Sequence, residues 1–150
     1  MQTKKNELTG AELTKYYNLY EGQLTVKTSQ HASRLFLEFA RSINSIDGWY
    51  VIFLGKKKNF LCWQNLQNFC ETDLIANDIT SFAKSIGSKH IYMARLDSGR
   101  NCSLCYIDIC WIASLHAFLL ERNIKLDDYL IVSEQKWCSY RDDNFREQYL

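Results

Sequence analysis

The residues best suited to chemistry by type and spacing are the cysteines, the acid and the histidine between positions 102 and 116. Cys102 and Cys105 form a C-x-x-C pair, with Cys110 five residues further on. Thiolates at this spacing can share a zinc ion or form a redox-active disulfide. A structural zinc site takes four ligands, usually from two such pairs, and the chain has no second C-x-x-C. Asp108 and His116 are the candidates to complete a metal site. The alternative, which we favour, is that the cysteines are small core residues near the start of a helix.

A second group of candidates is basic. Lys56, Lys57 and Lys58 are consecutive between two apolar runs, and Arg95 and Arg100 flank the short loop 97–99. Three lysines can contact a phosphate backbone, and two arginines can hold a phosphate or a carboxylate. These five residues are the candidates for nucleic-acid binding. The competing interpretation is a solvated hairpin tip and a solvated loop.

The composition limits the class of protein that can contain these candidate residues. The chain has 150 residues, 47% hydrophobic and 23% charged, with a formal net charge of +1 and no proline. Such a length predicts one domain, and the apolar fraction excludes wholesale disorder. Near-neutral charge argues against a general nucleic-acid binder. At average usage roughly seven prolines are expected, so their absence is a real bias.

The first half of the chain predicts a helix followed by a hairpin. Thr28 or Ser29 can cap a helix whose apolar residues recur at spacings of three and four as far as Ile43. Residues 49–54 are a β-branched and aromatic run of strand length, and 60–63 read as the return strand after a Lys-rich turn. Residues 1–23 are expected to be a polar arm, ending near a short extended segment.

The second half predicts alternating helices and strands. Gly87 occupies the place of a left-handed C-cap, and Asn123 that of a helix end. His90 is expected to point away from Ala94. The order predicts an α/β domain with a mixed β-sheet flanked by helices. The expected elements are 72–86, 91–94, 103–122, 129–132 and 137–140.

Two stretches carry a resemblance to a known family. The first stretch, residues 47–54 with a turn ending at Asn59, has the pattern of a strand and hairpin in that family. The second, Ile124 to Ser139, has the pattern of a later strand in that family and of the segment after it. In this order and spacing, residues 24–150 resemble the C-terminal domain of the RadC family, in the JAB/MPN metalloprotease-like superfamily. The resemblance implies a JAB/MPN (cytidine-deaminase-like) architecture.

The family's zinc site is largely missing from the matched positions. In the family, two histidines and an aspartate hold zinc, and a glutamate on the first strand is the general base. The histidines of the H-x-H-P-S-G motif fall on Ala94 and Leu96, and the glutamate on Gly48 or its neighbour Asp47. Alanine and leucine have no atom that can ligate a metal. The resemblance therefore implies the scaffold without its hydrolytic chemistry.

A few motif residues remain. Ser98 and Gly99 keep the Ser-Gly of the signature, and Asp97 stands in place of its proline. Ser103 and Asp108 match the family's S-x-x-D, although their spacing is two residues too long.

We therefore expect a non-catalytic RadC-like module, a pseudoenzyme without a cofactor, that binds a protein partner. One alternative is a metal-dependent hydrolase or zinc-binding protein with a rebuilt site of Cys102, Cys105, Asp108 and His116. Another is a DNA-binding accessory or a mobile-element-encoded inhibitor. No apolar run approaches 18 residues and the N-terminus lacks a signal-peptide core, so we expect a cytoplasmic protein without membrane contact. The sequence is also compatible with a homo-oligomer.

Overall fold

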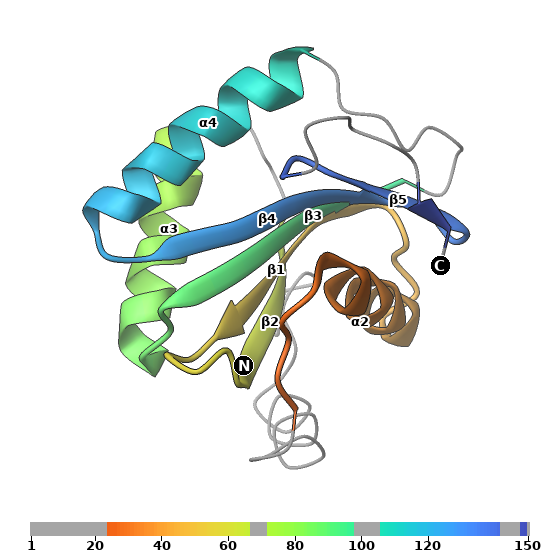
Figure 1. Ribbon diagram of the computed structural model, residues 1–150, viewed down its shortest axis with the longest axis horizontal. Helices are drawn as coiled ribbons and strands as arrows, with labels where there is room; N and C mark the ends of the chain where they lie inside the picture. Colours follow the sequence, from red (N-terminus) through yellow and green to blue (C-terminus); the bar gives the residue numbers. More distant parts are fainter. Residues whose placement is uncertain (1–23, 67–71, 98–105, 142–147, 150) are drawn as a thin grey trace, which may run out of the picture.

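The protein is built on a central mixed sheet of six strands in the order β2-β1-β3-β4-β5-β6. The computed structural model describes residues 24–66, 72–97, 106–141 and 148–149 (Figure 1). Neighbouring strands are antiparallel except for β3 and β4, which are parallel. The strands are β1 (Gly48–Leu54), β2 (Phe60–Leu66), β3 (His90–Leu96), β4 (Lys125–Val132), β5 (Lys136–Ser139) and β6 (Gln148–Tyr149).

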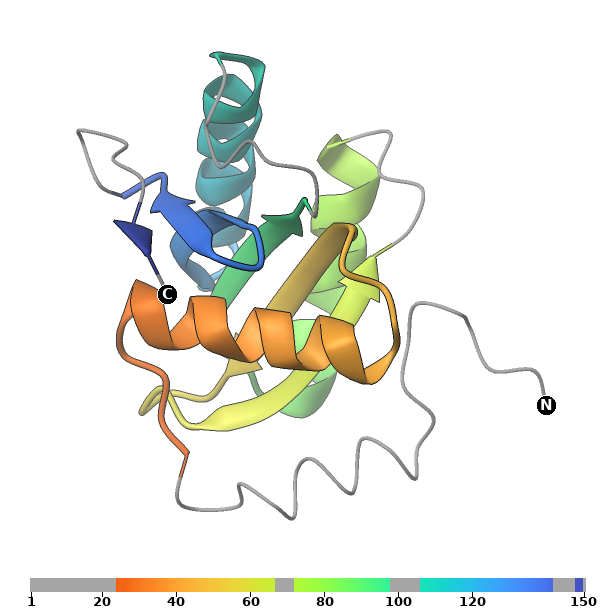
Figure 2. The ribbon, with the colours of Figure 1, turned by 90° about the vertical axis from the view of Figure 1, so that its right-hand side faces the viewer.

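Three helices cover the two faces of this sheet. Helix α2 (Ser29–Ser42) lies on one face, and α3 (Thr72–Ile86) and α4 (Tyr106–Glu121) lie on the other (Figures 1 and 2). The prediction of an α/β domain with a mixed sheet flanked by helices is confirmed. No helix in the described part of the chain is both long and apolar enough to cross a membrane.

The helix ends follow from the residues at them. Thr28 is extended, and its hydroxyl accepts a hydrogen bond from the backbone N–H of His31 at 3.1 Å, as expected of an N-cap. Gly87 and Asn123 follow α3 and α4 with φ angles of 75° and 62°. Both residue types tolerate this left-handed conformation, so the predicted helix ends are confirmed.

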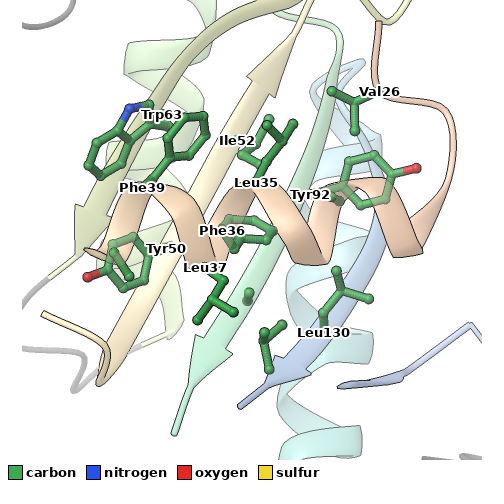
Figure 3. Packing of buried hydrophobic residues seen from close by; sticks show 14 of the residues in the cluster. Val26, Leu35, Phe36, Leu37, Phe39, Tyr50, Ile52, Trp63, Tyr92 and Leu130 are labelled. Atoms are coloured by element: carbon green, nitrogen blue, oxygen red, sulfur yellow. The ribbon is translucent and has the colours of Figure 1, made fainter. Parts of the chain in front are cut away.

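Each face of the sheet carries its own apolar cluster. Under α2, Phe39 stacks on Trp63 with ring centroids 4.8 Å apart, and Phe36 and Leu35 fill the space beside them (Figure 3). The opposite cluster is formed by α3, α4 and the other side of the strands. Alternation along β1 and β3 sends neighbouring side chains into different clusters, which explains why these strands read as continuous apolar runs.

Several strands differ from the prediction: β2 runs to Leu66 rather than to residue 63, and β3 covers His90–Leu96 rather than 91–94. β4 begins at Lys125 rather than at residue 129, so it contains Asp127 and Asp128. The short strand β6 was not expected from the sequence at all.

Candidate functional site

The two positions matched to the family's zinc-binding histidines lie on one strand of the sheet and are apolar. In the β1–β3 ladder Gly48 is opposite Leu96 and Tyr50 is opposite Ala94. Ala94 is fully buried and Leu96 is 2% exposed, both within the cluster under α2. Two residues apart on one strand, their side chains share a face, as two histidine ligands would. The fold therefore places Ala94 and Leu96 together among apolar side chains, whereas α4, which carries the third matched position, Asp108, covers the opposite face of the sheet.

The position matched to the general base is also unsuited to glutamate. Gly48 has a φ of 119°, a conformation that residues with a side chain rarely adopt. Its neighbour Asp47 is exposed to solvent. A carboxylate at residue 48 would require a change of backbone, and the one at residue 47 faces water.

Among the residues that the structure describes, the candidate ligands of a rebuilt metal site do not lie close together. Asp108 lies in the first turn of α4, and its side chain is outside the described part. His116 is eight residues later, about 12 Å along the helix axis. That separation is too large for a common ion with ligand bonds of about 2 Å. Among the described residues there is no group of three or more His, Cys, Asp or Glu side chains able to hold a metal. Ser98, Gly99, Arg100, Cys102, Ser103 and Cys105 lie outside the described residues.

The basic candidates are spread over the molecule. Lys56 and Lys57 are exposed at the β1–β2 turn, whereas Lys58 directs its Nζ inward to Oδ2 of Asp127 at 3.7 Å. Arg95 pairs with Asp97, Nη1 to Oδ2 at 3.4 Å, near the far end of β3. Because β3 starts beside the lysine turn, Arg95 is about 17 Å away along the strand. Among the described residues, these candidates do not form one basic patch.

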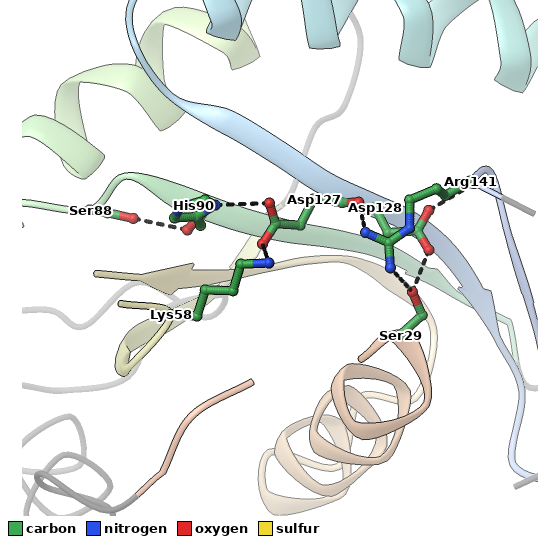
Figure 4. Close-up of polar contacts among 7 residues, drawn as sticks. All are labelled: Ser29, Lys58, Ser88, His90, Asp127, Asp128 and Arg141. Atoms are coloured by element: carbon green, nitrogen blue, oxygen red, sulfur yellow. Dashed lines mark hydrogen bonds and ion pairs between the residues drawn. The ribbon is translucent and has the colours of Figure 1, made fainter. Parts of the chain in front are cut away.

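The most polar part of the protein interior is a network that sequence reasoning missed. Asp127 and Asp128 are 3% and 2% exposed in the middle of the sheet. In the β3–β4 pairing, Ile91 is opposite Leu126 but Tyr92 is opposite Asp128, so Asp127 is an extra, bulged residue. The bulge interrupts alternation, and both carboxylates meet partners on the α2 side of the sheet (Figure 4).

Asp127 sits between two basic side chains. Its Oδ1 is 2.9 Å from Nδ1 of His90, and its Oδ2 faces Lys58. The expectation that His90 points away from Ala94 was wrong. His90 is the first residue of β3, an even number of positions from Ala94, so the two side chains share the face that Asp127 also occupies.

Asp128, within β4, joins the start of α2 and the end of β5 to that strand. Its Oδ2 accepts hydrogen bonds from the hydroxyls of Ser29 in α2, at 2.5 Å, and Ser139 in β5. Its Oδ1 accepts the backbone N–H groups of Tyr129 and Arg141 at 2.8 and 3.0 Å. A carboxylate that accepts four bonds needs no further partner.

Arg141 closes the network. Its Nη1 donates to the carbonyl oxygen of Asp127 at 3.1 Å, and Nη2 lies 3.5 Å from the Ser29 hydroxyl. Two aspartates are thus balanced by Lys58 and Arg141, with His90 beside them. Charges balanced by opposite charges can be buried without a ligand, and the hydrogen bonds of Asp128 and Arg141 hold α2 and β5 to β4.

Tyr92 lies against the same network. Burial of its hydroxyl raises the pKa of Tyr92 to about 12, and the neighbouring charge of Asp127 adds to the rise. The phenol is therefore neutral at physiological pH and is not a candidate base. Tyr50, Trp63 and Tyr129 are likewise buried, so these aromatic residues fill the core rather than anchor a partner.

In comparisons with known proteins, no family model matches the chain. No curated protein matches it either.

Proposed function

We propose that the chain is a non-catalytic RadC-like JAB/MPN domain that acts as a binding module for another protein. One observation carries the proposal. The two positions matched to the zinc-binding histidines, Ala94 and Leu96, are adjacent on one face of β3 and buried in hydrocarbon.

The arrangement of elements supports the scaffold part of the proposal. The order of helix, hairpin, helix, strand, helix and two strands is the one on which the resemblance rests. The strand that fits the family's first strand lies beside the strand that fits the H-x-H segment, with Gly48 opposite Leu96. Side chains at these two positions share one face of the sheet, whereas α4, which carries Asp108, covers the other face.

Side-chain chemistry supports the non-catalytic part. A zinc hydrolase needs ligands with lone pairs and a carboxylate that reaches the metal-bound water. The methyl group of Ala94 and the isobutyl group of Leu96 supply no lone pairs, and Gly48 supplies no carboxylate. Without these groups the matched positions cannot support zinc-dependent hydrolysis, which favours binding through the surface of the domain.

The compartment proposed is the cytoplasm. Among the described cysteines, Cys110 is a free and exposed thiol, and Cys62 and Cys138 are buried. Unpaired thiols are typical of proteins in reducing compartments.

The test is capture of partners from a lysate of the source cell, with the chain as bait, in the presence and absence of EDTA. We expect one protein to be retained in stoichiometric amount under both conditions and to remain uncleaved. The Asp108→Asn variant, which removes the one retained ligand, should behave like wild type and like the surface control Asp78→Asn. Cleavage of the captured protein that stops with EDTA or in Asp108→Asn would contradict the proposal.

A further inference from the structure

Exposed lysines gather where three turns meet at one end of the sheet. Lys56 and Lys57 lie in the β1–β2 turn, Lys89 directly precedes β3, and Lys125 is the first residue of β4. The backbone N–H of Lys89 donates to the carbonyl oxygen of Leu54, the last residue of β1, and the N–H of Lys125 donates to the carbonyl oxygen of Lys89, both at 2.9 Å. The turns are therefore neighbours along one rim of the molecule, at the lower left of Figure 1. We define these four lysines as the lysine rim.

The lysine rim has no ion-pair partner among the described residues. None of the ion pairs in this part of the chain involves one of its four side chains. Lys58, in the same turn as Lys56, differs because its Nζ is directed inward to Asp127. Glu121, at the end of α4, is paired with Arg122, with 3.7 Å between Oε2 and Nη1. Four positive charges therefore stay open to solvent at one end of the sheet.

The lysines form a row rather than a pocket. The strands β4, β3, β1 and β2, whose ends carry them, are consecutive neighbours in the sheet. Adjacent strands are about 4.8 Å apart, so the row extends over roughly 15 Å. A small phosphate ligand needs donors that converge on it, whereas a row of separate charges matches a polymer with regularly repeated charge. One strand of a nucleic-acid duplex carries a phosphate about every 3.4 Å along the axis, hence about four phosphates over this length.

The residues beside the lysines offer nothing apolar to a partner. Gly87 and Asn123 are exposed, and Ile124 is buried. Leu120, the one strongly exposed large apolar side chain among the described residues, belongs to α4 rather than to these turns. A membrane surface would favour apolar residues that insert among lipid chains, and single-stranded nucleic acid would favour aromatic residues on which bases stack. The row therefore suits the phosphate backbone of a duplex.

We propose that the lysine rim binds double-stranded nucleic acid through its phosphates, without reading the base sequence. Each Nζ donates to a phosphate oxygen, and the release of condensed counterions drives the association. The formal net charge of +1 is compatible with this binding, because the rim concentrates positive charge that the rest of the chain balances. The inference goes beyond the proposed protein binding and uses none of the matched zinc-site positions. Its failure would therefore leave the proposed function unaffected.

Fluorescence anisotropy with a labelled DNA duplex tests the proposal. We expect a dissociation constant in roughly the micromolar range at low salt. With four phosphate contacts, log affinity should fall against log salt with a slope of about −3.6, so a threefold rise in salt should weaken binding roughly fiftyfold. A duplex of scrambled sequence should bind equally well, because the lysines contact no base.

Paired charge variants locate the site. Lys89→Gln/Lys125→Gln removes half of the lysine rim, so the slope should become shallower by about 2 and binding at low salt should weaken about tenfold or more. Arg34→Gln/Arg41→Gln is the matched control, because it removes the same charge from exposed positions of α2, and it should leave the slope unchanged.

Three results would overturn the proposal. The first is a wild-type chain that does not bind the duplex at low salt. The second is an equal loss of binding in the two double variants, which would place the contact outside the lysine rim. The third is binding to vesicles of anionic phospholipid that exceeds binding to the duplex, which would favour a membrane surface as the partner.

Discussion

Nδ1 of His90, the first residue of β3, lies 2.9 Å from Oδ1 of Asp127, the bulged residue of β4. The two are 37 residues apart in sequence, and the Asp127 side chain is only 1% exposed. Asp128, directly after the bulge, gathers Ser29, Ser139 and Arg141. Because Arg141 contacts both aspartates, these residues form one connected network, on the same α2 side of the sheet as Ala94 and Leu96.

Removing the Asp127 carboxylate should destabilise the protein. Asp127→Ala leaves a buried gap and removes the hydrogen-bond partner of His90 and the ion-pair partner of Lys58, so the free energy of unfolding should fall by about 2–4 kcal/mol. Urea unfolding followed by circular dichroism measures the loss. Asp78→Ala, at an exposed position of α3, should change the value by no more than about 0.5 kcal/mol. Equal effects of the two substitutions would mean that the Asp127 contacts contribute nothing.

Even the isosteric substitution of Asp128 by asparagine should destabilise the protein. Asp128→Asn keeps the shape but turns an NH₂ group toward side-chain and backbone donors, with an expected loss of about 2–3 kcal/mol. Ser139→Ala removes one donor to Asp128 and one acceptor of the Arg141 N–H, which Asp128 also accepts, and should cost only about 1 kcal/mol. Thermal and urea unfolding of both variants give the comparison. An Asp128→Asn variant as stable as wild type would show that the four bonds do not require a carboxylate.

Stability should decline at high pH because of Tyr92. Its pKa is raised to about 12 in the folded protein, while an unfolded tyrosine titrates near 10. Below pH 10 both states hold the proton, so the contribution is fully present there. Between about pH 10 and 12 the unfolded state loses the proton first, and stability falls by about 2–3 kcal/mol. Urea midpoints of wild type and Tyr92→Phe, measured in parallel across this range, isolate the effect. The difference between them should shift in favour of the variant as pH rises, and a constant difference would refute the assignment.

The backbone at Gly48 should resist a glutamate. Because φ is 119°, Gly48→Ala and Gly48→Glu should both lower the free energy of unfolding, by about 1–2 kcal/mol. Asp47→Glu places the same carboxylate one residue earlier, on exposed backbone, and should be nearly neutral. Chemical unfolding of the three variants separates backbone strain from side-chain effects. If Gly48→Glu is as stable as Asp47→Glu, the position is not conformationally restricted.

Much of the fold could be predicted from local signals. The apolar runs of β1 and β3, the Thr28 cap and the Gly87 helix end are properties of a few adjacent residues. The first half of β4 could not be found this way, because two consecutive aspartates disfavour a strand. Their burial depends on Ser29, Lys58, His90 and Arg141, which come from separate segments. Only the three-dimensional pairing brings these residues together.

The matched zinc-site positions were predictable for the opposite reason. Ala94 and Leu96 are two apart on one strand, so strand alternation alone places them on a common face. That Gly48 lies opposite Leu96 on the neighbouring strand could not be predicted, because the β1–β3 register is not encoded by adjacent residues.

The central proposal is that this chain, which resembles the RadC family in sequence, does not bind the metal of a JAB-type hydrolase. Zinc analysis of tag-free protein, produced in zinc-supplemented medium, tests it most directly. We predict no zinc above the background of the buffer, in wild type and in Cys105→Ser alike. Stoichiometric zinc in the wild type that is lost in Cys105→Ser would contradict the account and establish a rebuilt metal site.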